Sequence, residues 1–307
     1  MTLVSELLPL YFSTNIKIRH PATRTHYKRS FRQYGDYLGH PPTLDDLDDD
    51  TLTGFLLWSL SHGLTEVTAN QRAKQVRAFW EWAARRRQVE KFPTLKFLDE
   101  PEQMPVAYTP QQVEQLFATC AKQTGYIGPS PSDLWWLSQH WWLYSTGERT
   151  EATLLLSRDH VDLTNQVARV PASIRKGGLK SMAYKLPNRL CELLAELFQY
   201  PSRSGLVWER NFGVSAYYHR YKRLVKAAGL PTPRGKCGPQ KMRITVFSMI
   251  EGLGGDATAF ARHSSRQVTD ESYIDQALVL AMRKGVWPPS TNPERPKGWR
   301  RWFGRAG

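Results

Sequence analysis

Residues 134–149 read LWWLSQHWWLYSTGER, and this stretch is the most informative one in the chain of 307 residues. Its first part carries four tryptophans at helical spacing: Trp135, Trp136, Trp141 and Trp142. Such a density of aromatic side chains is more typical of a buried core helix than of a base-stacking surface. Gly147 then ends the helix and Arg149 follows. An arginine at this place can bind phosphate oxygens in a bidentate manner, and it stays charged at any relevant pH.

The residues that follow predict a mixed α+β fold, because short strand patterns occur between helices. Residues 166–171 and 182–187 look like strands on either side of a basic turn that contains Lys176 and Lys180. Hydrophobic periodicity predicts three further helices. They are expected at residues 188–199, 215–228 and 244–253.

The first hundred residues predict an all-helical domain. Residues 22–38 have an apolar face at helical spacing, and further helices are expected at 50–60 and from about residue 68. The third of these helices carries basic residues away from its apolar face: Arg72, Lys74 and Arg77. A solvated helix face is the simpler interpretation of any one of these cations. Basic faces on successive helices nevertheless favour contact with DNA, and Lys180 in the later turn is a further candidate for it.

Residues 99–108 break the helical pattern with two prolines and several acids, which is typical of an interdomain linker. Thr109 and Gln112 then form a capping box, with Pro110 at the first helical position. The sequence therefore predicts a helical domain at 1–98 and a mixed domain at 109–285. Residues 286–307 form a basic, aromatic tail.

The charge balance indicates a polyanionic partner. The chain has 42 Lys and Arg residues against 28 Asp and Glu residues, a formal net charge of +14, and nucleic acid is the commonest partner of so basic a protein. Cys120, Cys191 and Cys237 lie far apart without a CxxC pair, which argues against a zinc finger and fits a reducing compartment. No apolar run reaches membrane-spanning length. We therefore expect a cytoplasmic protein that uses no metal and no membrane.

Several short motifs follow one another in the order that is typical of the tyrosine recombinases, also called the phage integrase family. Residues 146–149 (TGER) resemble the family's TGxR box, and residues 240–243 (QKMR) fall where its HxxR box belongs. Residues 263–265 (HSS) are similar to its GHSS segment, and Tyr273 lies in the nucleophile region. The resemblance covers nearly the whole chain. It implies a helical core-binding domain, a mixed catalytic domain and DNA cleavage without a metal, nucleotide or other cofactor.

The resemblance also implies a role for each catalytic residue. Tyr273 would attack a DNA phosphodiester and form a 3′-phosphotyrosine intermediate. Arg149 and Arg243 would stabilise the negative charge that builds up on the phosphate oxygens. His263 would add a hydrogen bond or a proton, and Lys176 in the predicted turn would protonate the leaving 5′-oxygen.

The chain departs from the family pattern at several positions. Gln240 stands where the family usually has histidine, and a glutamine cannot act as an acid or a base. The neighbouring Lys241 is a candidate substitute, so both are taken as auxiliary site residues. Arg262 replaces the glycine that usually precedes the histidine. Ala152 stands where a carboxylate is expected, with Glu151 one position early.

These departures leave a second hypothesis open, namely a DNA-binding accessory or regulatory protein that has lost catalysis. The retained set of predicted catalytic residues opposes it, since a simple binder needs no such set. A third hypothesis is a monomeric type IB topoisomerase, against which the short chain weighs.

The leading prediction remains a site-specific recombinase or integrase that acts on double-stranded DNA. The resemblance implies a homo-oligomer, a tetramer on two DNA sites, in which residues 277–284 are the candidate for a helix exchanged between protomers. It leaves open an accessory DNA-bending protein, the DNA target, and whether the enzyme serves a mobile genetic element or a chromosome.

Overall fold

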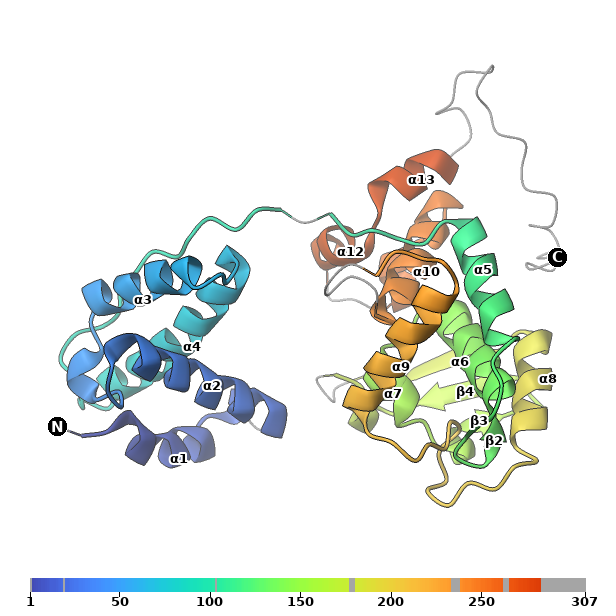
Figure 1. The fold of residues 1–307 in the computed structure, drawn as a ribbon, viewed down its shortest axis with the longest axis horizontal. Coiled ribbons are helices and arrows are strands. Elements are labelled where there is room, and N and C mark those ends of the chain that lie inside the picture. Colours follow the sequence, from blue (N-terminus) through green and yellow to red (C-terminus); the bar gives the residue numbers. More distant parts are fainter. Residues whose placement is uncertain are drawn as a thin grey trace. The chain divides into compact units, whose positions relative to one another are not determined.

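The computed structural model describes residues 2–18, 20–102, 104–176, 180–232, 238–261 and 265–282. Contacts within the chain divide it into two compact units, Met1–Gln103 and Met104–Gly307 (Figure 1). Each unit has its own hydrophobic core. Among the described residues, no helix has both the length and the apolar character needed to cross a membrane.

The first unit is helical among its described residues, apart from an isolated β-bridge between Leu3 and Thr43 and irregular segments. Its elements are α1 (Val4–Thr14), η1 (Ile16–Ile18), α2 (Pro21–Leu38), η2 (Leu44–Asp46), α3 (Asp49–Ser61) and α4 (Glu66–Arg85). Local caps set the helix boundaries, because the ends of a helix leave backbone groups without partners. The carboxylate of Asp48 accepts a hydrogen bond from the backbone N–H of Thr51, and the hydroxyl of Thr65 begins α4 in the same way. The predicted helices are thus confirmed, with α4 starting slightly earlier than expected.

Aromatic side chains form the core of the first unit. Phe31 and Tyr34 of α2 are buried together with Phe79 and Trp80 of α4. The rings of Phe31 and Phe79 meet edge to face with their centroids 5.2 Å apart, an arrangement that the charge distribution of aromatic rings favours. The apolar face predicted for residues 22–38 is therefore the face that α2 buries.

The second unit combines helices with two small sheets. Its first half consists of α5 (Pro110–Cys120), β1 (Tyr126–Ile127), β2 (Ser130–Pro131), α6 (Ser132–Thr146), α7 (Thr150–Leu154), η3 (Arg158–His160), β3 (Val161–Asp162), β4 (Val167–Val170) and η4 (Ala172–Ile174). Its second half consists of β5 (Met182–Lys185), α8 (Asn188–Leu197), α9 (Val214–Ala227), α10 (Gln240–Gly252), α11 (Ala257–Ala261), α12 (Arg266–Tyr273) and α13 (Gln276–Met282). The fold is therefore mainly α with a small amount of β structure, as the sequence predicts.

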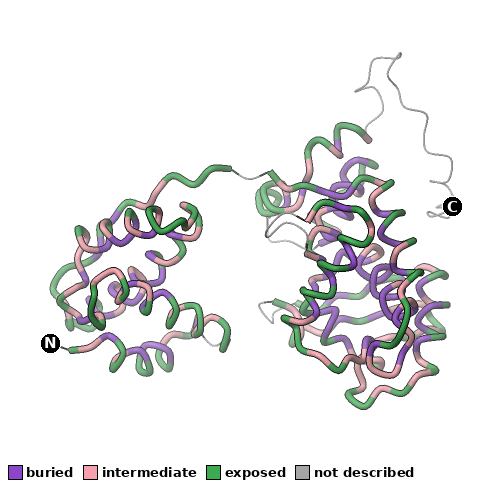
Figure 2. The backbone as a smooth tube through the Cα atoms, in the orientation of Figure 1, coloured by how far each residue is buried: buried purple, intermediate pink, exposed green. Residues whose placement is uncertain are grey.

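The aromatic helix α6 is the centre of this second core. All four of its tryptophans are buried, so the core interpretation of residues 134–144 is confirmed. Figure 2 shows buried segments gathered in the interior of this unit. Each fully buried indole N–H has a partner: Trp135 donates to the carbonyl of Glu209 at 2.9 Å, and Trp142 donates to the hydroxyl of Thr153 at 3.0 Å. These hydrogen bonds offset the cost of burying a polar group.

Strands β3, β4 and β5 form one antiparallel sheet in sequence order, and β4 and β5 are the two predicted strands. The strand predicted at 182–187 is shorter than expected, because Pro187 has no N–H to offer a neighbouring strand and begins α8 instead. The helix predicted at 244–253 is α10, which starts at Gln240. Pro239 occupies its N-cap position, so the QKMR segment forms the first turn of the helix rather than a loop before it.

Candidate active site

Arg149 lies between two helices at the end of the aromatic helix. Helix α6 ends at Gly147, which has a φ of 57° in the left-handed region, and Arg149 is the N-cap residue of α7. The side chain of Arg149 is half-buried. A β-carbon at Gly147 would lie 2.7 Å from the ring of Phe247, so glycine is required here both by conformation and by space.

Arg243 is buried in the first turn of α10, and only 2% of its surface is exposed. Its guanidinium donates a hydrogen bond to the carbonyl of Gly147 and stacks on two rings. Its central carbon lies 4.4 Å from the centroid of Phe247 and 4.9 Å from that of Tyr273. Burial lowers the pKa of Arg243, and the charge of Arg149 lowers it further. The two arginines predicted from separate motifs therefore act on each other electrostatically.

Tyr273, the predicted nucleophile, is the last residue of α12 and is half-buried. Burial by itself would raise the pKa of its phenol. The charges of Arg243 and Arg149, together with hydrogen bonds from both guanidinium groups, outweigh burial and hold the pKa below the ordinary value of 10.0. The structure thus brings together three of the predicted catalytic residues, and it places the tyrosine where neighbouring positive charges lower the pKa of its phenol.

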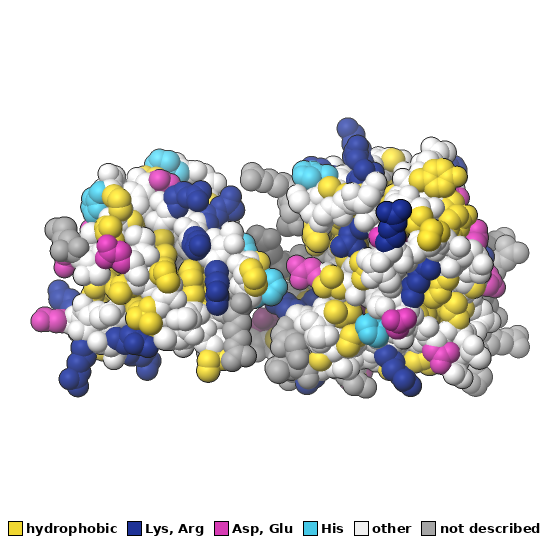
Figure 3. Space-filling view, turned by 90° about the horizontal axis from the view of Figure 1, so that it is seen from below, with side chains coloured by type: hydrophobic (Ala, Val, Ile, Leu, Met, Phe, Trp, Pro, Cys, Tyr) yellow, Lys and Arg dark blue, Asp and Glu magenta, His cyan; other side chains and the backbone are white. Residues whose placement is uncertain are grey.

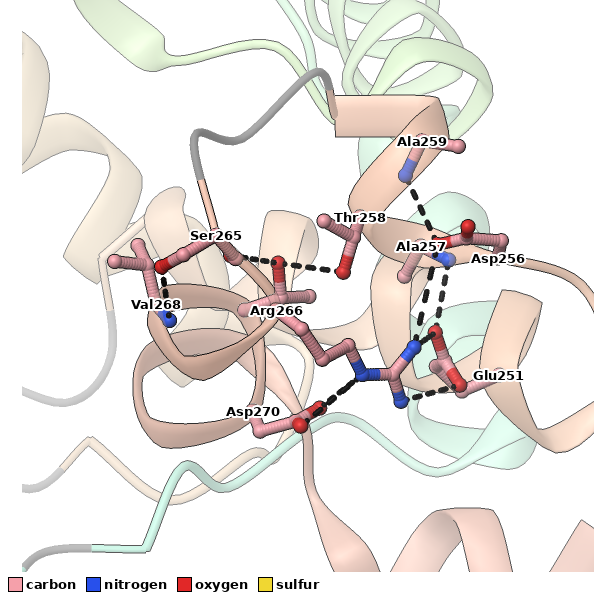
Figure 4. Close-up of polar contacts among 10 residues, drawn as sticks. Glu251, Asp256, Ala257, Thr258, Ala259, Ser265, Arg266, Val268 and Asp270 are labelled. Carbon is pink, nitrogen blue, oxygen red and sulfur yellow. Dashed lines mark hydrogen bonds and ion pairs between the residues drawn. The ribbon is translucent and has the colours of Figure 1, made fainter.

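A network of charged side chains fixes the start of α12 (Figure 4). Arg266 forms two hydrogen bonds with the carboxylate of Glu251, at 2.7 and 2.9 Å, and an ion pair with Asp270 at 2.9 Å. Glu251 is buried on α10 and also accepts the backbone N–H of Ala257 at the start of α11. The hydroxyls of Thr258 and Thr269 join α11 to α12 at 3.0 Å.

The end of α12 is held by α10 as well. The hydroxyl of Ser248 accepts the N–H of Asp275 at 2.8 Å, and its one proton is shared between the carbonyls of Ile244 at 2.8 Å and Tyr273 at 3.3 Å. Helix α10 packs against α11, α12 and α13, and it also carries Arg243. Tyr273 therefore sits on an element that is anchored at both of its ends.

Lys176 lies just after η4, on the connection between β4 and β5. It is exposed and forms no hydrogen bond or ion pair with any described residue. Lys180, at the far side of the same turn, is also exposed, and its carbonyl accepts a hydrogen bond from Arg175 at 3.0 Å. The neighbouring Arg175 is buried against Glu148 in an ion pair of 2.9 Å. Sequence reasoning did not assign a role to either member of this pair.

The two auxiliary candidates differ in their surroundings. Gln240 is exposed at the start of α10. Lys241 is half-buried, and its ammonium lies 4.5 Å from the ring centroid of Tyr108, an attractive contact between a cation and an aromatic face. His263 lies outside the described residues, as do Arg262 and the tail at 286–307, so their assigned roles remain predictions.

The basic residues proposed for α4 are engaged within the first unit. Lys74 forms an ion pair with Glu100 at 3.0 Å, and Arg77 forms one with Glu81 at 3.2 Å. Arg72 is half-buried, and its guanidinium donates to the hydroxyl of Ser30 at 3.5 Å. Their role in DNA binding remains a prediction, and these contacts would compete with phosphate.

A groove on the first unit offers a further basic surface. Its volume is about 940 Å³, and α2 contributes Arg24, Lys28 and Arg32 to its lining. Lys28 and Arg32 are exposed and form no ion pair with a described residue. Figure 3 shows one face of the first unit, on which Lys and Arg side chains lie among hydrophobic ones.

The fold of this chain is similar to that of three solved structures of DNA recombinases and integrases. An integrase of the Tn1549 transposon in complex with a circular intermediate DNA is 15% identical, with a TM-score of 0.72 over 90% of this chain and 96% of that chain. The XerH site-specific recombinase bound to a palindromic difH substrate is 15% identical, with a TM-score of 0.65 over 92% and 81%. A lambda integrase dimer bound to a core site is 14% identical, with a TM-score of 0.64 over 90% and 96%.

The sequence itself provides independent support in the first unit. Residues 14–87 match the family described as phage integrase, N-terminal SAM-like domain. A comparison with curated proteins gave no match. The resemblance to tyrosine recombinases is thus confirmed: the chain has their fold, with a helical N-terminal domain of the phage integrase type and a mixed second domain.

Proposed function

We propose that this chain is a site-specific DNA recombinase that cleaves and rejoins DNA through a covalent bond between Tyr273 and a 3′-phosphate. The observation that carries the proposal is the position of the Tyr273 ring against Arg243, with Arg149 close enough to form a hydrogen bond to its phenol. A half-buried tyrosine with a purely structural role has no need of two guanidinium groups at its hydroxyl. A tyrosine that attacks a phosphate needs both of them.

The chemistry follows from these charges. The Tyr273 oxygen attacks the phosphorus, the bond between phosphorus and the 5′-oxygen breaks, and negative charge develops on the non-bridging oxygens. Arg149 and Arg243 stabilise that charge, and His263 adds a hydrogen bond. Lys176 gives a proton to the departing 5′-oxygen. The phosphotyrosine conserves the energy of the broken bond, so a 5′-hydroxyl from a second strand can reverse the step without a nucleotide.

Double-stranded DNA is the proposed substrate. The three similar structures are complexes with DNA, and the net charge of +14 supports the same partner for this chain. A homo-oligomer, a tetramer on two DNA sites, is part of the proposal, because exchange between two duplexes requires four cleavages. Helix α13, which begins at Gln276, is the proposed element of exchange between protomers.

Covalent trapping tests the proposal directly. The wild-type protein and the variant Tyr273→Phe are incubated with fragmented DNA from the source genome, the reaction is stopped with detergent, and DNA linked to protein is sequenced. We expect adducts that require Tyr273 and that cluster at one repeated sequence. Adducts spread over all sequences would indicate a topoisomerase. If both proteins bind DNA and neither forms an adduct, the chain is a binder without catalysis.

A further inference from the structure

Glu148 is a buried carboxylate that joins two parts of the site. Its Oε1 accepts the backbone N–H of Arg149 at 2.8 Å. Its Oε2 accepts a hydrogen bond from Nε of Arg175 at 2.9 Å and another from the hydroxyl of Tyr184 at 2.9 Å. The side chain of Glu148 is 0% exposed. One carboxylate therefore links the first arginine motif to the hairpin formed by β4 and β5.

Arg175 extends this link across the turn that contains Lys176. Its Nε donates a hydrogen bond to the carboxylate of Glu148, and its Nη1 donates one to the carbonyl of Lys180 at 3.0 Å. The side chain of Arg175 is only 8% exposed, whereas Lys176 is exposed. Because Lys176 directly follows Arg175, any shift of Arg175 moves the backbone from which the Lys176 side chain extends.

Stability alone does not account for this buried pair. Replacing a buried ion pair with apolar side chains of similar size is often neutral or stabilising, because the desolvation of two charges offsets their attraction. What such a pair does supply is a fixed geometry, since a guanidinium and a carboxylate bind in only a few orientations. Within residues 146–154, Glu148 is the buried acid: Glu151 is exposed, and the buried Ala152 occupies the place where the family pattern has a carboxylate.

We propose that Glu148 and Arg175 are positioning residues. They fix the backbone at Lys176 in its position relative to Arg149. The inference rests on the proposed function. In the cleavage step, the proton of the Lys176 ammonium moves to the 5′-oxygen as its bond to phosphorus breaks. Arg149 contacts the non-bridging oxygens of the same phosphate. A general acid must lie within hydrogen-bond reach of the oxygen that it protonates, so loss of the anchor impairs this proton transfer first.

A change of leaving group separates positioning of the acid from other effects. The DNA site recovered by covalent trapping is prepared with either oxygen or sulfur as the bridging 5′ atom. A thiolate leaves without a proton, because a thiol has a pKa of about 8.5, far below that of an alcohol. We expect Glu148→Gln and Arg175→Ala to slow single-turnover cleavage of the oxygen substrate by about tenfold or more, and of the sulfur substrate by less than about threefold. Arg149→Ala should slow both. Equal slowing of both substrates by Glu148→Gln, or no slowing, overturns the proposal.

Hydrogen exchange tests the anchor without DNA. Tyr184→Phe is the matched control, since it removes one hydrogen bond from the same Oε2 and leaves the ion pair intact. We expect faster exchange in peptides that contain Arg175 and Lys176 for Glu148→Gln, and exchange like the wild type for Tyr184→Phe. If Glu148→Gln does not fold, Arg175→Lys replaces it. This variant keeps the positive charge and loses the planar guanidinium group. Wild-type protein that forms no adduct would refute the proposed function, whereas unchanged exchange in the anchor variants would refute the inference.

Discussion

The guanidinium of Arg243 lies face-on to the ring of Tyr273, 4.9 Å from its centroid, although the two residues belong to different helices. Phe247, one turn after Arg243 on α10, contacts both of them: its ring lies 4.4 Å from the guanidinium of Arg243 and 5.5 Å from the ring of Tyr273. The cation therefore lies against two aromatic rings that also contact each other edge to face. This arrangement determines the electrostatics of the predicted nucleophile.

The phenol of Tyr273 should lose its proton at a lower pH than the phenol of an ordinary tyrosine. Its pKa in the folded protein is lowered, so the ionised form is stabilised by folding. The contribution of Tyr273 to the free energy of folding is then complete above about pH 10 and is lost as the pH falls through the lowered pKa. The ultraviolet absorbance difference between wild type and Tyr273→Phe should show a phenolate step below pH 10. Arg149→Ala should move that step to higher pH, and a step at or above pH 10 in the wild type would contradict the structure.

Substitution of Gly147 should destabilise the second unit for two reasons. Gly147→Ala places a side chain at a φ of 57° and a β-carbon 2.7 Å from Phe247. The left-handed conformation and the overpacking together should lower the free energy of unfolding by about 2–4 kcal/mol, measured in urea. Gly229→Ala is the control, because Gly229 has a φ of 70° with nothing within 4 Å, and it should cost only about 1–2 kcal/mol. Equal losses in the two variants would show that Phe247 accommodates the extra carbon.

Removal of Arg266 should loosen the helix that carries Tyr273. Arg266→Ala leaves the buried carboxylate of Glu251 without its charged partner, and we expect a loss of about 1–2 kcal/mol in unfolding free energy together with slower cleavage. The value is modest because Arg266 is 52% exposed. Adding Glu251→Gln to the Arg266→Ala variant should recover part of the lost unfolding free energy, since burying a neutral amide costs less free energy than burying an unpaired carboxylate. Arg189→Ala, which breaks an exposed pair with Glu192, should change stability by less than about 0.5 kcal/mol.

Binding of nonspecific duplex DNA should weaken steeply with salt, because phosphate contacts release counterions. Lys28→Ala and Arg32→Ala should each reduce the slope of log affinity against log salt by about one, if each cation meets one phosphate. Lys74→Ala should change the slope less, because Lys74 must first leave its ion pair with Glu100. Fluorescence anisotropy with a labelled duplex measures all three variants. A larger effect for Lys74 than for Lys28 would favour α4 as the DNA-contacting helix, as the sequence pattern first indicated.

Local features of the sequence were sufficient to predict most of the secondary structure. The capping box of Thr109 and Gln112 forms as expected, with hydrogen bonds of 3.1 and 3.2 Å, because a cap depends only on residues within one turn. Helix α6 was recognisable from its apolar periodicity and from the glycine at its end. The start of α10 was misplaced, because QKMR has no apolar periodicity that would mark it as helical.

The order of motifs along the chain determined the set of candidate residues, but not their contacts. Sequence spacing predicts that Arg149, Arg243 and Tyr273 share a site only through resemblance to known recombinases. Their actual proximity depends on how α10 packs against α6 and α12, and packing between helices is fixed by side chains far apart in the sequence.

The sequence by itself thus determined the positions of most helices and the basic character of the chain, since these depend on composition or on neighbours within a few positions. It determined the candidate catalytic residues through the order of their motifs. Only the tertiary structure decided which charges are paired. It shows Glu148 with Arg175 and Glu251 with Arg266, and it shows that Lys74 is occupied by Glu100. Ion pairs between distant residues form when folding brings them within about 4 Å of each other, and no local pattern encodes that distance.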